Sequence, residues 1–579
     1  MKKRLLVFTL ALFTCLLFVL PSASFAANPV MTADLGSSTG APLHGATGFL
    51  YGLADNSTPS DSNLTGLNSL DMTGQMAPGG LQHSGGDAFV VADKWFRTGG
   101  KYVQIYMQDI YAQWPYPNTF SDYLNKVTTI ANQVKNNANR TKFLYVPFNE
   151  PDWIWYGNSG TKLTNFQNDW KTVFQLIRSI DPSAKIVGPN FEHYNSAAYR
   201  SFFTFAKANN VLPDYTSWHE LDDTTSTWYY SYNDYRSIEN SLGISARPIT
   251  INEYGKSTEL GNPGKMTQYM ARFENSKVHA GLAYWFMEGQ LDELLTPSQT
   301  RSGAWYLYQW YGGFSGNTIN VTPPSENGAM QGLGYYDSGK KLSAVIFGGG
   351  SGSLDFNLTR IPSALQTSGV TKVEVWGVDN SNKTTSSGTY LISSNNYTVS
   401  GGSVQLTVNN LNANSAYQLV IKPGDGSGGS GGSWDPNTYY KIIARHSGKA
   451  LDVSGGSTAD GGDVIQWTTS GNANQQWKIE SVGSGYYKIT NRNSGKVLDV
   501  YQASTADGGD VVQWTASGSS GSSNQQWSIE QVGSYYKIVN RNSGKALDVY
   551  QASTADGANV VQWMTSSSPA TNQQWTITP

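Results

Sequence analysis

Apolar and polar positions follow two different periods along this chain, and the period predicts the class of each region. Between about residues 45 and 312, short apolar runs at 102–107, 143–147, 185–188, 215–219, 249–254 and 281–286 alternate with segments of helical period. One of these segments places Leu163, Phe166, Trp170 and Val173 on a single helical stripe. Strands that alternate with helices predict a parallel sheet covered by helices.

The runs at 48–53 and 87–91 are the predicted first and second strands of this region. They complete a (β/α)8 TIM barrel within residues 27–313, and the first few residues of that range can instead pair with the next domain. An open doubly wound sheet is the alternative topology. It needs a glycine-rich dinucleotide or phosphate loop, and no such loop follows a predicted strand.

Residues 314–423 change to an alternation of period two, as in the runs 342–347, 372–376 and 404–408, with Asn, Gly and Ser turns between them. This pattern predicts a β-sandwich. Residues 424–433, GDGSGGSGGS, offer nothing that a core can bury and predict a flexible linker. The chain is therefore predicted to be multidomain, with residues 434–579 as a domain of their own.

The last domain contains three copies of one unit. Residues 486–514 match residues 535–563 at all but four of 29 positions, and each unit ends in Asn-Gln-Gln-Trp. Short apolar strands between Gly, Ser and Asn turns favour an all-β barrel, and three units of similar length favour a closed threefold body. The Trp that closes each unit is predicted to lie in the core.

This domain resembles the ricin-type β-trefoil lectins, also grouped as carbohydrate-binding module family 13, because all three units carry the Gln-x-Trp signature. The resemblance implies that one Asp in each unit accepts hydrogen bonds from sugar hydroxyls beside an Asn-Gln pair, while a Trp stacks on the sugar ring. The implied sugar-binding residues are Asp452, Trp467, Asn474 and Gln475, then Asp499, Trp514, Asn524 and Gln525, then Asp548, Trp563, Asn572 and Gln573.

Two predicted barrel strands end on the same Asn-Glu dipeptide, Asn149-Glu150 and Asn252-Glu253. In (β/α)8 barrels the chemistry lies at the carboxyl ends of the strands. Hydrolysis of a glycosidic bond requires two carboxyl groups that face each other across that bond. Burying two glutamates at such positions for structure alone is unfavourable, because each loses its hydration. The pair therefore predicts a glycosidase.

These Asn-Glu motifs resemble those of the clan A glycoside hydrolases, and together with the sandwich the region looks most like glycoside hydrolase family 39. The resemblance implies that Glu150 is the general acid/base and Glu253 the nucleophile of a double displacement that retains the anomeric configuration. It also implies that Glu150 is protonated at first while Glu253 stays ionised.

Further substrate-binding residues are predicted at or just after strand ends. Asn149 is implied to hold the sugar 2-hydroxyl. The clan places a tyrosine after the histidine of the sixth strand, where this chain has Glu220, and either Tyr254 or a loop tyrosine is expected to take its role. The full predicted set is Asn149, Trp153, His219, Glu220, Tyr254 and Trp285.

The amino terminus predicts the compartment. Lys2, Lys3 and Arg4 precede an apolar run and a small-residue site at Ala26, which predicts a signal peptide over residues 1–26 and a secreted, extracellular product. The only cysteine, Cys15, lies in this segment, so no internal disulfide is expected in the mature protein. No second apolar run is long enough to span a bilayer, so no membrane partner is expected after cleavage.

The amino-acid composition indicates which classes of binding partner to expect. The chain has 18 Trp and 34 Tyr beside only 14% charged residues, a balance common in proteins that handle neutral polysaccharides. It has no basic cluster of the kind that binds phosphates, so no nucleic-acid partner is expected. With six histidines and no His-Glu-x-x-His or paired acidic loop, no metal and no cofactor are expected. We expect a monomer.

These observations predict a retaining glycosidase that acts on plant cell-wall polysaccharide. Hemicellulose, either xylan or an arabinose-containing relative, is favoured because trefoils of this kind commonly accompany such enzymes. Two alternatives stay open. One is a transglycosylase, in which an acceptor sugar replaces water, and the other is a non-catalytic carbohydrate-binding protein.

Overall fold

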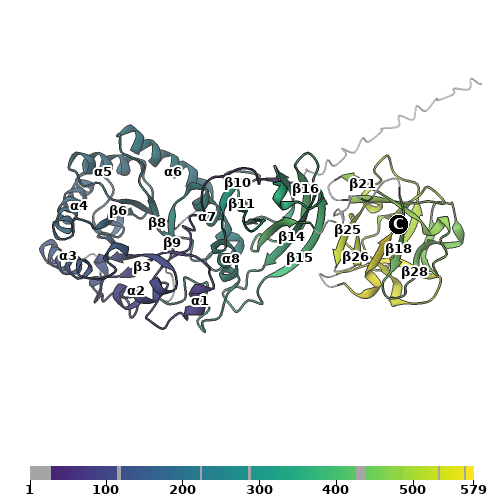
Figure 1. The fold of residues 1–579 in the computed structure, drawn as a ribbon, viewed down its shortest axis with the longest axis horizontal. Coiled ribbons are helices and arrows are strands. Elements are labelled where there is room, and N and C mark those ends of the chain that lie inside the picture. Colours follow the sequence, from purple (N-terminus) through teal and green to yellow (C-terminus); the bar gives the residue numbers. More distant parts are fainter. Residues whose placement is uncertain are drawn as a thin grey trace, which may run out of the picture.

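Three bodies follow one another along the chain: a barrel, a sandwich and a trefoil (Figure 1). The computed structural model describes residues 28–113, 119–221, 224–283, 288–424, 434, 438–483, 486–532, 535–565 and 569–579. The predicted signal peptide, Trp285 and all but the first residue of the predicted linker lie outside the described residues. The multidomain fold class predicted from the sequence is confirmed.

The first body is a closed barrel of parallel strands that run in chain order from β2 to β9. β2 pairs in parallel with β9, with Gly48 opposite Gly281, and this pairing closes the ring. The strands are β2 (Gly48–Leu50), β3 (Leu70–Met76), β4 (Gly100–Tyr106), β5 (Phe143–Val146), β6 (Lys185–Phe191), β7 (Tyr215–Glu220), β8 (Ile249–Tyr254) and β9 (His279–Leu282). The helices are α1 (Asp61–Thr65), α2 (Ala88–Arg97), α3 (Phe120–Lys135), α4 (Gly160–Ile180), α5 (Ser196–Ala208), α6 (Thr224–Ser241), α7 (Pro263–Ser276) and α8 (Gly303–Gly312).

The second strand of the barrel is not the predicted one. It is β3, whereas residues 87–91 lie at the start of α2. The Asp87 carboxylate accepts hydrogen bonds from backbone amides of the first helical turn and caps the helix. β3 is buried along its whole length although Asp71 and Gln75 are polar, so its hydropathy does not mark it as a buried strand.

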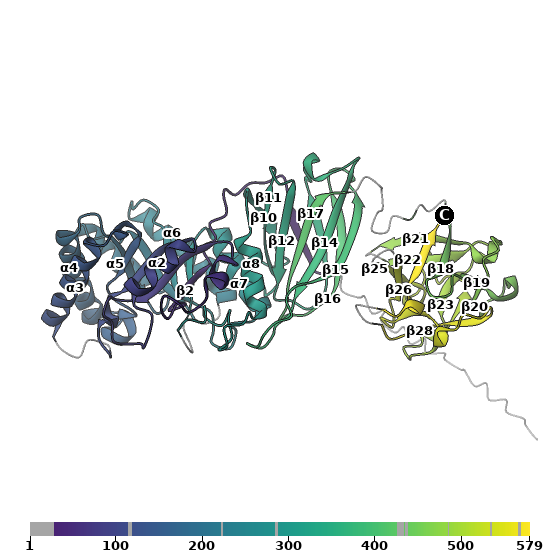
Figure 2. The ribbon, with the colours of Figure 1, turned by 60° about the horizontal axis from the view of Figure 1, so that its bottom comes forward.

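The second body is a nine-stranded sheet that folds around its own apolar core. Its strands are β1 (Val30–Asp34), β10 (Asn317–Thr322), β11 (Gln331–Asp337), β12 (Leu342–Gly348), β13 (Gly352–Thr359), β14 (Val370–Val378), β15 (Tyr390–Thr398), β16 (Val404–Leu411) and β17 (Ala416–Pro423). β1 pairs with β10 and β13, so the first described strand belongs to the sandwich. Helix α7 is buried on nearly all sides because β11 and β12 pack against it (Figure 2).

The third body repeats four strands three times. β20, β24 and β28 pair with one another around the centre. The closing residues Trp477, Trp527 and Trp575 are fully buried, and each indole N–H donates to a backbone carbonyl of its own unit, so their predicted core role is confirmed. The strands are β18 (Tyr439–Ala444), β19 (Ala450–Val453), β20 (Gly462–Trp467), β21 (Trp477–Gly483), β22 (Tyr486–Asn491), β23 (Val497–Val500), β24 (Gly509–Trp514), β25 (Trp527–Val532), β26 (Tyr535–Asn540), β27 (Ala546–Val549), β28 (Ala558–Trp563) and β29 (Trp575–Thr578).

None of the helices in the described ranges has the length and apolar character that crossing a membrane requires.

Candidate active site

Glu150 follows β5 and stands just before a short π-helix, Pro151–Trp155. Its backbone is left-handed, with a φ of 46°, a conformation that costs free energy for a residue with a side chain. The Glu150 N–H donates to the Asn190 carbonyl at the end of β6, 3.0 Å away, and this bond fixes the turn. A strained but braced backbone at a strand end is a common feature of functional sites.

Glu253 lies in β8 at an irregularity of the sheet. The pairing of β8 with β9 shifts register between Ile251 and Tyr254, and the pairing of β7 with β8 shifts between Trp218 and Glu220. Register breaks of this kind re-aim side chains. The Glu253 side chain keeps 14% of its surface exposed, so solvent and ligands can reach it.

His219, in β7, brings the two glutamates together. Its Nδ1 lies 3.1 Å from Oε1 of Glu150, and its Nε2 lies 3.8 Å from Oε1 of Glu253. One carboxylate oxygen of each glutamate lies within 4.8 Å of the other. The two predicted acids, far apart in sequence, therefore face one small space at the barrel mouth.

The electrostatics of this centre are set by burial and by opposite charges. Burial raises the pKa of Glu253 above its ordinary value, although the nearby His219 imidazolium opposes the rise. Burial alone would lower the pKa of His219, but the Glu253 and Glu150 carboxylates raise it to about 9. His219 is therefore protonated at neutral pH and stabilises an ionised neighbour. The division of protons between Glu150 and Glu253 before the reaction stays a prediction.

The same three side chains could hold a metal ion. Among the residues that the structure describes, Glu150, His219 and Glu253 offer ligand atoms that all lie within 4.8 Å of one another. Two carboxylates and an imidazole suit a divalent transition metal. A metal must first displace a proton from His219, because an imidazolium nitrogen that carries a proton has no lone pair to donate. The absence of a metal from the working site stays a prediction.

Three other predicted residues are sequence neighbours of Glu150 or His219. The Asn149 side-chain oxygen accepts a hydrogen bond from the Asn190 amide, 2.8 Å away. Oε1 of the buried Glu220 accepts one from the Trp218 indole N–H at 2.7 Å. Trp153, in the π-helix, is 67% exposed, so its ring is accessible to a ligand. Their substrate-binding roles stay predictions.

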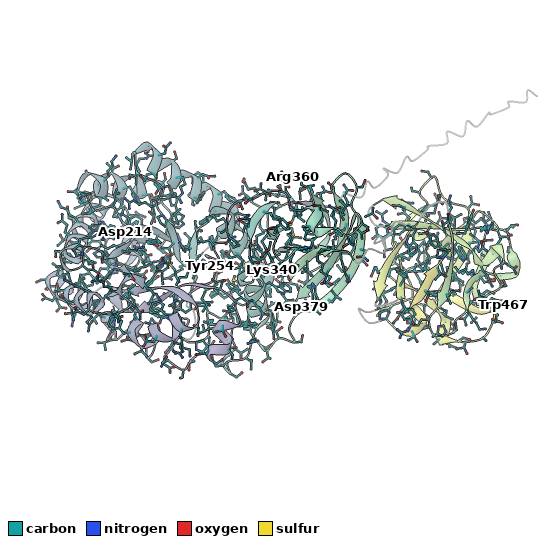
Figure 3. The ribbon with its side chains drawn as sticks, viewed as in Figure 1. Asp214, Tyr254, Lys340, Arg360, Asp379 and Trp467 are labelled. Atoms are coloured by element: carbon teal, nitrogen blue, oxygen red, sulfur yellow. The ribbon has the colours of Figure 1, made fainter. Side chains whose placement is uncertain are left out.

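Tyr254 does not face the glutamates, and its predicted substrate-binding role is wrong. The ring packs against Tyr269 and Phe273 of α7, on the side of the barrel toward the sandwich (Figure 3). Its hydroxyl donates to the Ala46 carbonyl at 2.9 Å. Successive residues of a strand point to opposite faces, so Tyr254 lies in the helix layer when Glu253 points into the mouth.

Two buried carboxyl groups near Glu253 were missed by the sequence analysis. Asp109, after β4, accepts a hydrogen bond from the Tyr51 hydroxyl. Burial raises the pKa of Asp109 to about 8, against the effect of this hydrogen bond and with a further contribution from Glu253. In Asp292 one oxygen accepts from the Leu50 N–H at 3.1 Å, and the other is buried with no hydrogen-bond partner among the described residues.

The two missed carboxyls differ in the signal that their sequence gives. Asp109 comes two residues after the end of the predicted strand 102–107, where a search of strand ends could have found it. Asp292 lies in the long connection between β9 and α8, which has no recognisable pattern.

The turn that carries Asp292 is strained. Leu291, Asp292 and Glu293 have φ values of 50°, 50° and 70°, a left-handed run that residues with side chains rarely adopt. Lys383, from the loop between β14 and β15, lies 2.7 Å from the Glu293 carboxylate. A charge on the sandwich thus braces a strained turn of the barrel.

The trefoil repeats one polar arrangement three times. In the first unit, Oδ2 of Asp452 accepts hydrogen bonds from Asn474 at 3.0 Å and from Gln475 at 2.8 Å. Trp467 is 45% exposed on the outer surface (Figure 3). The amides fix the orientation of the carboxylate, as recognition of a sugar hydroxyl requires. The second and third units repeat this geometry with Asp499, Asn524, Gln525 and Trp514, and with Asp548, Asn572, Gln573 and Trp563.

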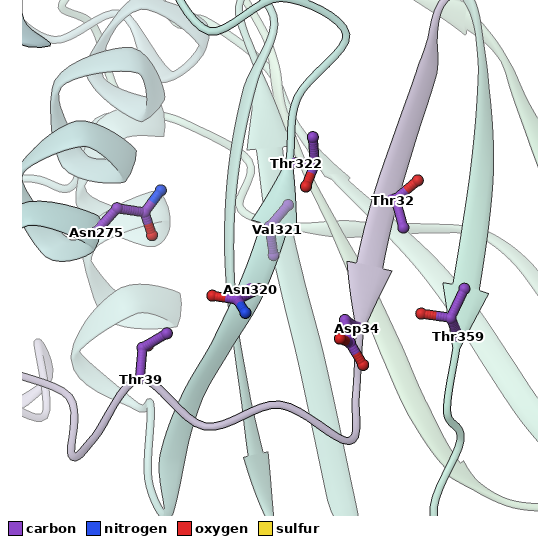
Figure 4. Close-up of a pocket in the computed structure, with 8 residues that line it drawn as sticks. All are labelled: Thr32, Asp34, Thr39, Asn275, Asn320, Val321, Thr322 and Thr359. Carbon is purple, nitrogen blue, oxygen red and sulfur yellow. The ribbon is translucent and has the colours of Figure 1, made fainter.

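A separate hollow of about 430 Å³ lies on the sandwich, facing the end of α7 (Figure 4). No aromatic ring lines it, so it lacks the flat apolar surface that sugar sites use. Its lining residues are Thr32, Asp34, Thr39, Asn275, Asn320, Val321, Thr322 and Thr359.

Comparison with known proteins supports the class of the last domain. A family model described as "Ricin-type beta-trefoil lectin domain-like" matches residues 430–514 and 519–579. The C-terminal domain is a ricin-type β-trefoil, as the resemblance of its repeats implied.

Curated relatives of this chain are glycosidases. The 3-O-alpha-D-galactosyl-alpha-L-arabinofuranosidase of Bifidobacterium longum subsp. longum is 30% identical over 381 residues, which cover 55% of this chain and 34% of the relative. The 3-O-beta-L-arabinopyranosyl-alpha-L-arabinofuranosidase of Bifidobacterium pseudocatenulatum is 30% identical over 378 residues, 56% of this chain and 39% of the relative. This chain therefore spans little more than a third of the length of these relatives.

This chain is similar to named glycosidases over more than half of its own length. The solved structure of the protein N2152 from Neocallimastix frontalis is 33% identical and covers 68% of this chain and 99% of that chain, with a TM-score of 0.64. The trefoil is only about a quarter of this chain, so the match must include most of the barrel and sandwich. This part of the chain belongs to the same family as that protein.

A solved glycoside hydrolase family 39 enzyme from Xanthomonas axonopodis pv. citri also matches. It is 11% identical, and the match covers 70% of this chain and 100% of that chain with a TM-score of 0.48.

Proposed function

We propose that this chain is a secreted, monomeric, retaining glycoside hydrolase that acts on arabinose-containing plant cell-wall polysaccharide. The observation that carries the proposal is the approach of Glu150 and Glu253 to within 4.8 Å, oxygen to oxygen, beside His219. Retaining glycosidases place their two carboxyl groups about 5–5.5 Å apart, whereas inverting enzymes need about 6.5–9.5 Å to admit water. The observed spacing supports a double displacement.

In the first step of this reaction, ionised Glu253 attacks the anomeric carbon and forms a glycosyl ester. Glu150 donates its proton to the departing glycosidic oxygen as the bond to that oxygen breaks. In the second step Glu150 takes a proton from water, the hydroxide attacks the anomeric carbon, and Glu253 leaves as a carboxylate. The His219 charge, close to both acids, favours the ionised form of Glu253 on which the first step depends.

The substrate class follows from the relatives and from the polar groups beside Glu253. Both curated relatives are named as α-L-arabinofuranosidases that take a substituted arabinose. Asp109 and Asp292 supply buried carboxyls that can bind hydroxyls of the sugar attached to Glu253. We therefore assign α-L-arabinofuranosyl residues of hemicellulose as the first substrates to test, with the trefoil holding the enzyme on the polymer.

Azide rescue of alanine variants tests this mechanism. With 4-nitrophenyl α-L-arabinofuranoside, azide should restore turnover of Glu253→Ala and give a glycosyl azide of inverted configuration. It should restore Glu150→Ala with retained configuration, because the glycosyl ester still forms when the leaving group needs no proton. Glu326→Ala, at an exposed glutamate, is the control. Wild-type rates in either active-site variant, on every glycoside that the wild type cleaves, would refute the assignment.

Loss of the exposed trefoil tryptophans tests the tethering role. The full-length variant with Trp467, Trp514 and Trp563 all changed to Ala should act more slowly on insoluble arabinoxylan and normally on soluble aryl glycosides. An equal loss on both substrates would contradict a role for the trefoil in holding the polymer.

A further inference from the structure

A hollow of about 450 Å³ opens beside Glu220 at the barrel mouth. Its walls come from the loop after β6, the start of α5, the end of β7 and the first turns of α6. It therefore lies between β5 and β8 around the ring, the strands that precede Glu150 and contain Glu253. Its lining includes His193, Tyr194, Asn195, Glu220, Tyr230 and Ser231.

The hollow is joined to the turn that presents Glu150. The Glu192 N–H donates to Oδ1 of Asp152 at 2.9 Å, and the Glu150 N–H donates to the Asn190 carbonyl at 3.0 Å. Asp152 belongs to the π-helix after Glu150, and Glu192 immediately precedes His193 in the wall of the hollow. Two hydrogen bonds thus hold this wall against the Glu150 turn.

The other part of the barrel mouth, after β4 and β9, contains buried carboxyl groups. Asp109 after β4 and Asp292 after β9 are both buried and close enough to Glu253 for its charge to raise the pKa of each, after the larger effect of burial. One oxygen of Gln75 and one of Asp292 are buried with no hydrogen-bond partner among the described residues. Such atoms can accept hydrogen bonds from the hydroxyls of a sugar that is bonded to Glu253.

The part of the mouth with Asp109 and Asp292 and the part with the hollow lie on different sides of the scissile bond. The nucleophile bonds to the anomeric carbon of the sugar on its own side, and the acid donates to the oxygen of the leaving group. The sugar bonded to Glu253 belongs with the buried carboxyls, so the leaving group extends past Glu150 toward the hollow.

The lining of the hollow has the chemistry of a sugar site. Tyr230 is 69% exposed and offers a flat apolar ring. The Glu220 carboxylate is buried and held by the Trp218 indole N–H at 2.7 Å. The Tyr194 hydroxyl donates to Asp234 at 2.5 Å, which fixes that ring in the wall. A flat ring beside fixed polar groups is what a pyranose or furanose requires.

We propose that this hollow binds one neutral sugar residue on the leaving-group side of the scissile bond. The Tyr230 ring lies against the apolar face of that sugar, and the Glu220 carboxylate accepts a hydrogen bond from one of its hydroxyls. This assignment rests on the proposed function, because the reaction defines the leaving-group side.

The test compares a substrate whose leaving group is a sugar with one whose leaving group fills no subsite. An arabinoxylan-derived oligosaccharide and α-L-arabinofuranosyl fluoride serve as this pair. In Tyr230→Ala, kcat/KM on the oligosaccharide should fall by about tenfold and stay unchanged on the fluoride. Tyr230→Phe keeps the ring and should match the wild type on both substrates. Tyr390→Ala, at an exposed tyrosine of the sandwich, is the control.

Each outcome decides between the two claims. Equal losses on both substrates in Tyr230→Ala, or no loss on the oligosaccharide, would overturn the subsite and leave the proposed function standing. A wild type that cleaves neither substrate would refute the proposed function, and the subsite with it.

Discussion

The ammonium group of Lys383, on the sandwich, lies 2.7 Å from the carboxylate of Glu293, on the barrel. Glu293 ends the left-handed run that carries Asp292, so this ion pair connects the second domain to the active-site mouth. Left-handed backbone is unfavourable for side-chain-bearing residues and persists only where surrounding contacts hold it. The sandwich therefore contributes to the geometry of the barrel site.

Removing this ion pair should lower activity more than stability. We expect Lys383→Met to reduce kcat/KM several-fold on arabinofuranosides, because Asp292 then loses its fixed position beside Glu253. Lys422→Met is the matched control, since Lys422 pairs with Glu374 at 2.6 Å within the sandwich and is 37% exposed, against 38% for Lys383. Similar kinetic losses in both variants would argue against the brace.

The charge of His219 should set the acid limb of the pH profile. In His219→Gln the positive charge that lowers the pKa of Glu253 is gone, so that pKa should rise. The acid limb of kcat/KM reports ionisation of the nucleophile and should therefore move to higher pH. We also expect kcat to fall on the order of 10²-fold.

His279→Gln is the control for the His219 variant. His279 also pairs with a buried carboxylate, Asp71 at 2.5 Å, but it lies at the start of β9, at the end of the barrel opposite the glutamates. The acid limb of kcat/KM in His279→Gln should stay at the pH of the wild type. A shift of equal size in both variants would show that the limb reports general destabilisation of the barrel.

Asp109 should make the barrel less stable as the pH rises. The folded-state pKa of Asp109 is raised to about 8, whereas an unfolded Asp titrates near about 3.9. The folded state therefore holds a proton that the unfolded state releases, and stability falls as the pH rises from about 4 to about 8. Asp109→Asn removes this loss.

Calorimetry at two pH values measures this effect. We expect the thermal midpoint of Asp109→Asn to exceed that of the wild type by a few degrees at pH 8.5, since each kcal/mol shifts a domain of this size by about 2–4 °C. The difference should shrink at pH 5. A difference that does not depend on pH would refute the linkage.

The sequence predicted the parts of the site that local patterns encode. Glu150 and Glu253 were recognisable because the same Asn-Glu dipeptide ends two apolar runs, and His219 ends a third apolar run. β3 was missed because Asp71 and Gln75 are buried along it, so it has the hydropathy of a loop.

The rest of the site depends on contacts between distant segments. Tyr254 was misplaced although strand alternation alone puts it on the face opposite to Glu253, the residue before it in β8. Asp292 was missed because its left-handed turn depends on Leu50 and Lys383, which lie far from it in the chain.

The three predicted sugar sites of the trefoil should not bind equally. Tyr501 lies 5.9 Å from Trp514, and Tyr550 lies 6.1 Å from Trp563, ring centre to ring centre. In the first unit Ser454 occupies the position of these tyrosines, so Trp467 has no ring of this kind beside it. Paired rings cover more of a sugar face than one ring does.

Single substitutions in the full-length protein test this inequality. In affinity electrophoresis through soluble arabinoxylan, Trp514→Ala and Trp563→Ala should each reduce retardation more than Trp467→Ala does. Ser454→Tyr should increase retardation, because it gives the first site the ring that the others have. Equal effects of the three Trp variants, together with no gain in Ser454→Tyr, would mean that the tyrosines take no part in binding.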